Sequence, residues 1–178
     1  MLSTEGHPYI LKYVRMSVAS MITTILSDFA RVIIKPKDKS YTGALNSMHR
    51  DLVEKLGEQY NVFDYFEINT KLLDFYKTLK PRFSVNMFTK GSLQNHPMLK
   101  SQLESVFENI FSAQSLGLNK GEVSAYLSVA EKLHTKPECI VYLDDQVKNM
   151  EAAEKGGLIA LHYTDNDKEI INKVTALL

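Results

Sequence analysis

The chain has 178 residues, of which 44% are hydrophobic, and its 21 basic and 21 acidic residues give a formal net charge of zero. This balance argues against a nucleic-acid-binding protein that works through bulk electrostatics, since such domains carry a basic excess. No apolar run approaches the roughly 20 residues needed to cross a bilayer, and the single cysteine cannot form a disulfide within the chain. We therefore expect a soluble, cytoplasmic protein with one α/β domain, a small insertion and no affinity for nucleic acids or membranes.

The first part of the chain predicts an arm followed by a strand. Residues 1–20 carry no cleavage signal or long apolar core, and we interpret them as an appended N-terminal arm. The apolar, β-branched run at 22–27 ends at Asp28 and is typical of a buried strand. The chain stays largely apolar to Ile34, and Pro36 with its neighbouring charges is expected to break the element there.

Residues 36–66 predict a small helical insertion. Apolar residues at helical spacing favour one helix at about 43–60. The aromatic side chains of Phe63, Tyr65 and Phe66 follow it, and we expect them to pack between the insertion and the rest of the domain.

The rest of the chain alternates between strand and helix patterns. The predicted strands cover residues 83–88, 110–111, 139–143 and 158–162. The predicted helices cover residues 70–79, 97–106, 121–133 and 147–155, with a last helix capped by Asp165 or Asn166. Such alternation implies a parallel sheet with right-handed crossovers and helices on both faces. We therefore predict a three-layer, Rossmann-like α/β core made of residues 21–35 and 67–178.

Two of the predicted strands end in acidic residues. Asp28 closes the first strand, and Asp144 and Asp145 close the strand at 139–143. If these strands are parallel neighbours, three carboxylates meet at the carboxyl edge of the sheet, where open α/β sheets bind their ligands. Like charges so close together persist only with a cation or shared protons between them. The pattern therefore predicts a divalent metal site.

Three more polar side chains fall at the ends or flanks of the predicted strands. A hydroxyl at Thr89 and an ammonium group at Lys120 have the chemistry to bind phosphoryl oxygens and to offset charge that develops on them. Lys90, which follows Thr89, is a further candidate phosphate ligand. Asp28 could then attack phosphorus as a carboxylate nucleophile, while Asp144 and Asp145 hold Mg²⁺, which prefers oxygen ligands.

The order and context of these residues resemble the haloacid dehalogenase (HAD) superfamily of phosphatases and related hydrolases. Four segments carry the resemblance: 25–33, 85–89, 107–120 and 142–153. The resemblance implies a Mg²⁺-dependent phosphatase in which Asp28 forms an aspartyl-phosphate, with Thr89 and Lys120 on the phosphoryl group. It also implies that the metal lies between Asp28, Asp144, Asp145 and the backbone carbonyl of Ala30.

Three positions depart from the family pattern. Phosphatases of the family usually have an acid two residues after the nucleophile, which protonates the leaving group and activates water, whereas this chain has Ala30. Such general acid–base help is worth about 10²–10⁴-fold in rate, so we expect slow turnover. Arg31 stands where small residues are usual, and Gly121 replaces the frequent proline after the lysine.

The missing acid leaves other interpretations open. The chain could be a binding or regulatory protein that kept the fold and lost turnover. It could instead use a Schiff-base lysine from Lys35, Lys37 or Lys39, as one branch of the family does, although a charge run is usually a solvated loop. His49 and His96 are candidates for the proton transfer, but surface or capping roles are more common for such histidines.

The insertion at 36–66 occupies the place of the family's helical cap, which closes over the substrate and sets specificity. With room for only one or two helices, it predicts an open site. Its substrate would be a small phosphorylated metabolite or a phosphorylated macromolecule. A partner, such as the second chain of a homodimer, is another way to close such a site.

Overall fold

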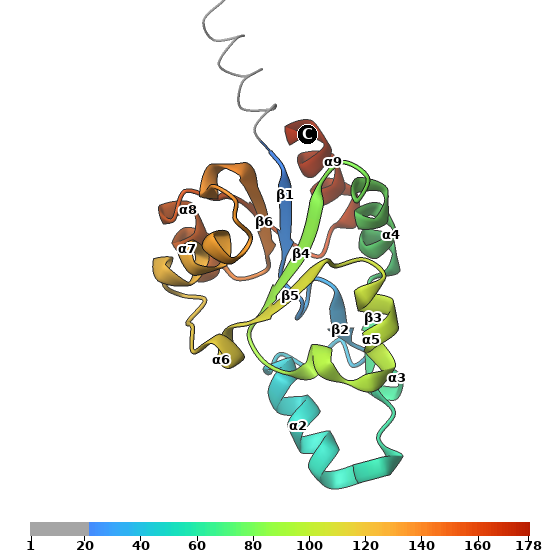
Figure 1. Cartoon of the computed structure of the whole chain (residues 1–178). Helices are drawn as coiled ribbons and strands as arrows, with labels where there is room; N and C mark the ends of the chain where they lie inside the picture. Colours follow the sequence, from blue (N-terminus) through green and yellow to red (C-terminus); the bar gives the residue numbers. More distant parts are fainter. Residues whose placement is uncertain (1–21) are drawn as a thin grey trace, which may run out of the picture.

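The computed structural model describes residues 22–178 and has a five-stranded parallel sheet at its centre (Figure 1). Its spatial order is β5-β4-β1-β6-β7, and every neighbouring pair is parallel. The strands are β1 (Thr24–Ser27), β4 (Ser84–Thr89), β5 (Asn109–Ser112), β6 (Ile140–Asp144) and β7 (Ile159–His162). The two strands that end in acid, β1 and β6, are direct neighbours, as the sequence predicts.

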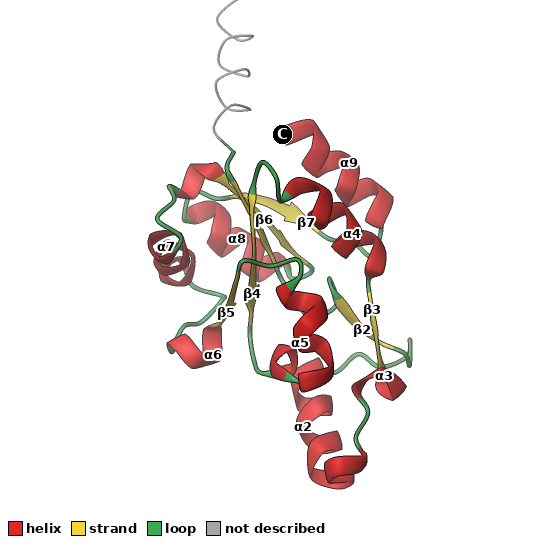
Figure 2. Ribbon diagram, turned by 45° about the vertical axis from the view of Figure 1, so that its right-hand side comes forward, coloured by secondary structure: helices red, strands yellow, loops and turns green. Residues whose placement is uncertain are grey.

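Helices cover both faces of the sheet and complete the three layers (Figures 1 and 2). One face packs against α7 (Val123–Lys132) and α8 (Val147–Lys155). The other face packs against α4 (Thr70–Leu79), α5 (Pro97–Glu104) and α9 (Asp167–Leu177). Successive strand residues point to opposite faces, so Ile25 and Leu26, both fully buried, belong to different hydrophobic clusters. The predicted three-layer α/β architecture is therefore confirmed.

The segment between β1 and β4 contains a two-stranded ribbon that the sequence pattern did not indicate. Strands β2 (Ile34–Pro36) and β3 (Phe66–Ile68) pair in antiparallel fashion. Strand β2 ends at Pro36, so the expectation that this proline and the charges beside it break the element is confirmed, and the missing N–H of the proline is tolerated at the end of a ribbon strand. The apolar run before it forms a buried turn around Val32 and Ile33 rather than an extension of β1.

Between the ribbon strands lie α2 (Leu45–Leu56), a 3-10 turn (Gly57–Gln59) and α3 (Val62–Tyr65). Phe66 is fully buried, and Phe63 and Tyr65 pack against the core cluster, as predicted. The exact limits of the insertion stay a prediction, and the predicted arm at 1–20 lies outside the described residues. Among residues 22–178, no helix has the length and apolar character that crossing a membrane requires.

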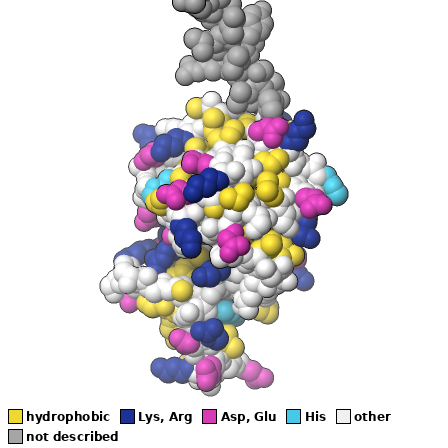
Figure 3. Space-filling model, turned by 90° about the vertical axis from the view of Figure 1, so that its left-hand side faces the viewer, with side chains coloured by type: hydrophobic (Ala, Val, Ile, Leu, Met, Phe, Trp, Pro, Cys, Tyr) yellow, Lys and Arg dark blue, Asp and Glu magenta, His cyan; other side chains and the backbone are white. Residues whose placement is uncertain are grey.

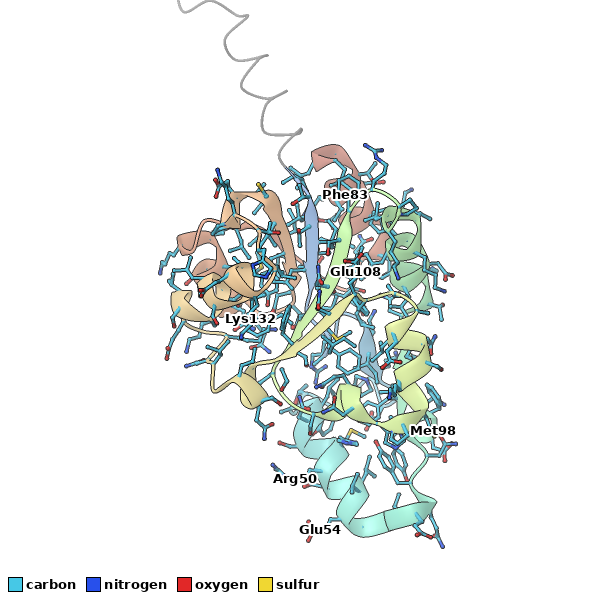
Figure 4. The ribbon with its side chains drawn as sticks, in the orientation of Figure 1. Arg50, Glu54, Phe83, Met98, Glu108 and Lys132 are labelled. Carbon is cyan, nitrogen blue, oxygen red and sulfur yellow. The ribbon has the colours of Figure 1, made fainter. Side chains whose placement is uncertain are left out.

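Helix α2 extends beyond the carboxyl ends of the sheet strands (Figure 1). Within it only Leu45 is fully buried, and Arg50 and Glu54 project away from the core (Figure 4). Its first turn is attached to the loop after β4, because Asn46 Oδ1 accepts hydrogen bonds from the backbone N–H groups of Ser92 and Leu93, both at 3.0 Å. This attachment holds the start of α2 over the carboxyl edge of the sheet.

The remaining short elements are α6 (Ala113–Leu116) and the 3-10 turns Leu93–Asn95 and Pro137–Cys139. Helix α6 follows β5 directly, and it ends at Gly117 in the left-handed conformation. The chain from Gly117 to Lys120 then runs back across the carboxyl edge of the sheet toward α7.

Candidate active site

The parallel register of β1 and β6 brings Asp28 and Asp144 to the same level of the sheet. Ser27 pairs with Leu143, so the next residue on each strand is an aspartate. The backbone N–H of Asp28 also donates to the carbonyl of Leu143 at 2.7 Å, which extends the ladder to the last residue. Both carboxylates are almost completely buried, with exposed fractions of 3% for Asp28 and 0% for Asp144.

Lys120 supplies the cation between these two carboxylates. Its Nζ atom donates to Oδ1 of Asp28 and lies 3.0 Å from Oδ2 of Asp144. A third contact, 2.9 Å to the carbonyl of Phe88, fixes the ammonium group against β4. Because the side chain is only 5% exposed, this lysine is a buried counter-ion and not a solvated one.

Hydrogen bonds hold the Asp144 carboxylate in one orientation. Its Oδ2 atom accepts from the hydroxyl of Tyr142 and from Nδ2 of Asn149 at 3.0 Å, and its Oδ1 atom accepts from the backbone N–H of Gln146 at 2.7 Å. Sequence analysis did not identify Tyr142 as part of this site. The available signal is the two-residue period of a strand, which puts Tyr142 and Asp144 on the same face of β6.

Burial and like charge shift the ionisation of this cluster. Burial is the largest effect on Asp28, and with the charges of Asp144 and Asp145 it raises the pKa of Asp28 above its usual value, against the opposing charge of Lys120. Burial and the charge of Asp144 raise the pKa of Asp145 to about 6. Burial lowers the pKa of Lys120, but the charges of Asp28 and Asp144 outweigh that effect and raise it overall. Lys120 therefore stays protonated, while the carboxylates still carry uncompensated negative charge.

The three aspartates fit a divalent metal ion. Asp28, Asp144 and Asp145 each offer one carboxylate oxygen, and these atoms lie within 4.8 Å of one another. The Oδ1 atom of Asp145 is buried without a hydrogen-bond partner among the described residues, which is costly unless another group, such as a metal, binds it. Carboxylate oxygens are the ligands that Mg²⁺ prefers, so the donor set and the unpartnered oxygen both suit such an ion.

A cavity of about 380 Å³ opens above this cluster, a size typical of small-ligand sites. Asp28 and Lys120 line its floor, and Ala30, Lys90 and the start of α2 line its walls. Thr89 lies at the end of β4, next to the carbonyl that Lys120 contacts. Its Oγ1 atom is also buried without a partner among the described residues. The structure thus brings the residues predicted to attack phosphorus, to bind phosphate and to hold the metal to one edge of the sheet.

The alternative residues do not reach this cavity. Neither His49 nor His96 lines it. The His96 side chain accepts a hydrogen bond from the backbone N–H of Met98 at the start of α5, and His49 Nδ1 lies 3.1 Å from the Tyr60 hydroxyl. Lys35 is only partly exposed and contacts the Tyr163 hydroxyl at 2.9 Å, instead of lying in a solvated loop.

Replacing Lys120 by methionine should destabilise the protein, because it leaves two buried carboxylates without their counter-ion. We expect the free energy of unfolding to fall by about 3–5 kcal/mol in metal-free buffer, and to fall less when Mg²⁺ is present to bind those carboxylates. Denaturant titration with and without Mg²⁺ measures both values. Lys132→Met at the exposed end of α7 (Figure 4) is the matched control. Equal stability losses in the two variants would contradict the counter-ion role.

Comparison with known proteins agrees with this fold. No family model matches the sequence. Solved structures that resemble the chain include a HAD-superfamily hydrolase of Geobacter sulfurreducens, with TM-score 0.62 and 16% identity over 86% of this chain and 97% of that one. A predicted HAD-like hydrolase of Porphyromonas gingivalis has TM-score 0.61 and 16% identity, covering 87% and 98%. A HAD family enzyme of Bacteroides thetaiotaomicron, crystallised with magnesium and inorganic phosphate, has TM-score 0.57 and 15% identity, covering 79% and 93%.

One curated protein shows sequence similarity, the sesquiterpene phosphatase AstK of Aspergillus oryzae. It is 30% identical over 61 residues, which is 34% of this chain and 31% of that protein, so the match spans about a third of each. At these identities the solved structures establish the architecture. The chain has the HAD-like fold, as the sequence resemblance predicts, and its aspartate cluster lies at the carboxyl edge of the sheet.

Proposed function

We propose that this chain is a Mg²⁺-dependent phosphatase that hydrolyses the monoester of a small phosphorylated metabolite. The observation that carries the proposal is the buried Asp28–Lys120–Asp144 cluster on the floor of the cavity, with two unpartnered oxygens beside it. The HAD family enzyme crystallised with magnesium and inorganic phosphate and the sesquiterpene phosphatase support the same chemistry. A metabolite fits the size of the cavity better than a macromolecule does.

In the first step, a carboxylate oxygen of Asp28 attacks phosphorus while the bond to the leaving oxygen breaks. The ammonium group of Lys120 and the hydroxyl of Thr89 donate to the phosphoryl oxygens as charge develops on them. Bound Mg²⁺ would neutralise phosphoryl charge and be held by Asp28, Asp144, Asp145 and the Ala30 carbonyl. The alkoxide takes its proton from solvent, because Ala30 has no acidic group.

In the second step, water attacks phosphorus of the aspartyl-phosphate, and the P–O bond to Asp28 breaks to release inorganic phosphate and the free carboxylate. No carboxylate is present at position 30 to accept the proton of that water. We therefore propose slow turnover, with this second step limiting.

Removal and return of the metal test the proposal. Turnover of 4-nitrophenyl phosphate should be lost in a chelator and restored by Mg²⁺ but not by Na⁺ at equal ionic strength. Phosphate release at steady state is the measurement. Turnover that persists unchanged in the chelator would exclude the proposed site.

A second candidate function is a phosphate-binding or regulatory protein, and the absence of an acid at Ala30 favours it. Beryllofluoride with Mg²⁺ mimics the aspartyl-phosphate and separates the two. A large rise in melting temperature without any phosphate release supports the binding protein, whereas a rise together with slow release supports the phosphatase. The predicted homodimer and cytoplasmic location stay predictions.

A further inference from the structure

The walls of the cavity carry more positive charge than a single phosphate group needs. Its charged lining residues among residues 22–178 are Asp28 and four cations: Arg31, Lys90, Lys120 and Lys148. Lys120 is paired with the buried carboxylates, but the other three make no salt bridge with an acidic residue of the described chain. They come from three different segments, the loops after β1 and β4 and the first turn of α8. Figure 3 shows Lys and Arg side chains gathered near a hollow between the main body and the segment below it.

The charges do not balance with a simple monoester. The three aspartates against the four cations leave one positive charge, and a divalent metal ion raises this to three. A phosphate dianion then removes two charges and leaves one cation in excess. A second anionic group on the substrate would balance it.

Two of the unpaired cations occupy positions that are unfavourable without a ligand. Arg31 adopts a φ of 62°, a left-handed conformation that costs a non-glycine residue free energy. Lys148 lies in the first turn of α8, where the positive end of the helix dipole disfavours a cation and where the turn itself contains no acidic residue. Placements that cost stability occur often at binding sites.

The glycine at position 121 makes room for Lys148. A Cβ atom at Gly121 would lie 2.6 Å from Cε and 3.0 Å from Nζ of Lys148, so any side chain there would push the ammonium group away. Gly121 does not adopt the left-handed conformation, so backbone strain does not explain the glycine. Because Gly121 has no side chain, the Lys148 ammonium group can lie directly beside its backbone, next to Lys120 in the sequence.

We propose that the substrate carries a second anionic group, a carboxylate or a further phosphate, which is bound by Lys148 together with Arg31 and Lys90. The inference rests on the proposed function only because the first phosphate is assigned to the Asp28 site. Arg31 already donates from Nη2 to the carbonyls of Tyr41 and Gly43, both at 2.9 Å, and its other N–H groups are available for an anion.

Binding of two matched phosphonates tests this assignment without catalysis. Propylphosphonate and 3-phosphonopropanoate share the phosphonate but differ in the terminal carboxylate, and neither has a hydrolysable P–O ester. Calorimetric titration in Mg²⁺ should give about 10-fold tighter binding of the carboxylate compound, the effect of about one charge-assisted hydrogen bond. The quantity to compare between the wild type and the variants is the ratio of the two affinities. Any effect of a substitution on binding of the phosphonate group is common to both compounds and cancels in this ratio. Propane-1,3-bisphosphonate distinguishes a second phosphate from a carboxylate.

The ratio should fall toward one in Lys148→Gln and in Gly121→Ala, which displaces the Lys148 ammonium group without removing a charge. Lys90→Gln should lower it less, and the exposed Lys132→Gln should leave it unchanged. Equal binding of both phosphonates to the wild type would overturn the second anion site and leave the phosphatase proposal standing. Failure of both to bind, together with no phosphatase turnover, would overturn the first phosphate site, whereas failure of both with normal turnover would overturn the second anion site alone. A preference that survives all three cavity variants would exclude Lys148 and Lys90 as its cause and overturn the proposed site.

Discussion

Asp28→Asn should abolish phosphatase turnover and leave the fold intact. The amide cannot act as a carboxylate nucleophile, and loss of such a group typically costs about 10⁴-fold or more in kcat. The side chain keeps its size, and its Oδ1 atom can still accept the hydrogen bond from Lys120 that the carboxylate accepts now. The measurement is steady-state phosphate release from 4-nitrophenyl phosphate in saturating Mg²⁺.

The same substitution should separate catalysis from stability. The three carboxylates of the cluster, two of them buried against Lys120, repel one another, and removal of one charge relieves that repulsion while Lys120 keeps its contact with Asp144. We therefore expect the melting temperature in a chelator to be unchanged or higher, and its rise on addition of Mg²⁺ to shrink. Asp74→Asn is the matched control, since Asp74 is exposed on α4 and its pair with Lys77 is of the weak surface type. Activity that survives Asp28→Asn with its Mg²⁺ dependence intact would show that another group attacks phosphorus.

The arrangement of the main site could be predicted because it depends on short-range patterns. An apolar run that ends in acid defines a buried strand and the position of its last residue, and parallel pairing then fixes the level of Asp28 beside Asp144. Asn69 illustrates the same principle for helices, because its side chain accepts from the N–H of Leu72 and starts α4 at the predicted place. Patterns of this kind need no knowledge of distant contacts.

Contacts between distant segments were not accessible to the same reasoning. The β2–β3 ribbon joins residues about 30 positions apart, and the apolar turn before it has the same hydropathy as a longer β1. Lys35 looked like part of a charged loop because its partners, Tyr163 and Asp165, follow more than 100 residues later. The packing of Lys148 against Gly121 likewise depends on how the first turn of α8 meets the loop before α7.

Ala30→Asp should raise turnover, because it supplies the acid that the first motif lacks. Ala30 is partly exposed and lines the cavity beside Asp28, so a carboxylate built there has room to enter it. General acid–base catalysis contributes about 10²–10⁴-fold, and we expect a gain in kcat within that range. The gain in kcat/KM, which reports the first step, should be larger for an alkyl phosphate, whose leaving alkoxide needs a proton, than for 4-nitrophenyl phosphate, whose leaving group departs as a stable anion.

Two controls distinguish proton transfer from a change of charge or shape. Ala30→Asn has nearly the same shape without an acid and should give no gain. Ala44→Asp adds a carboxylate elsewhere on the same cavity wall, at the exposed residue before α2, and should not raise turnover either. If Ala30→Asp exceeds both controls, and more so with the alkyl ester, then the scaffold, the nucleophile and the phosphate ligands are functional and slow turnover follows from the missing acid. If it matches Ala30→Asn, the missing acid does not limit the reaction, and the binding or regulatory function becomes the better explanation of this site.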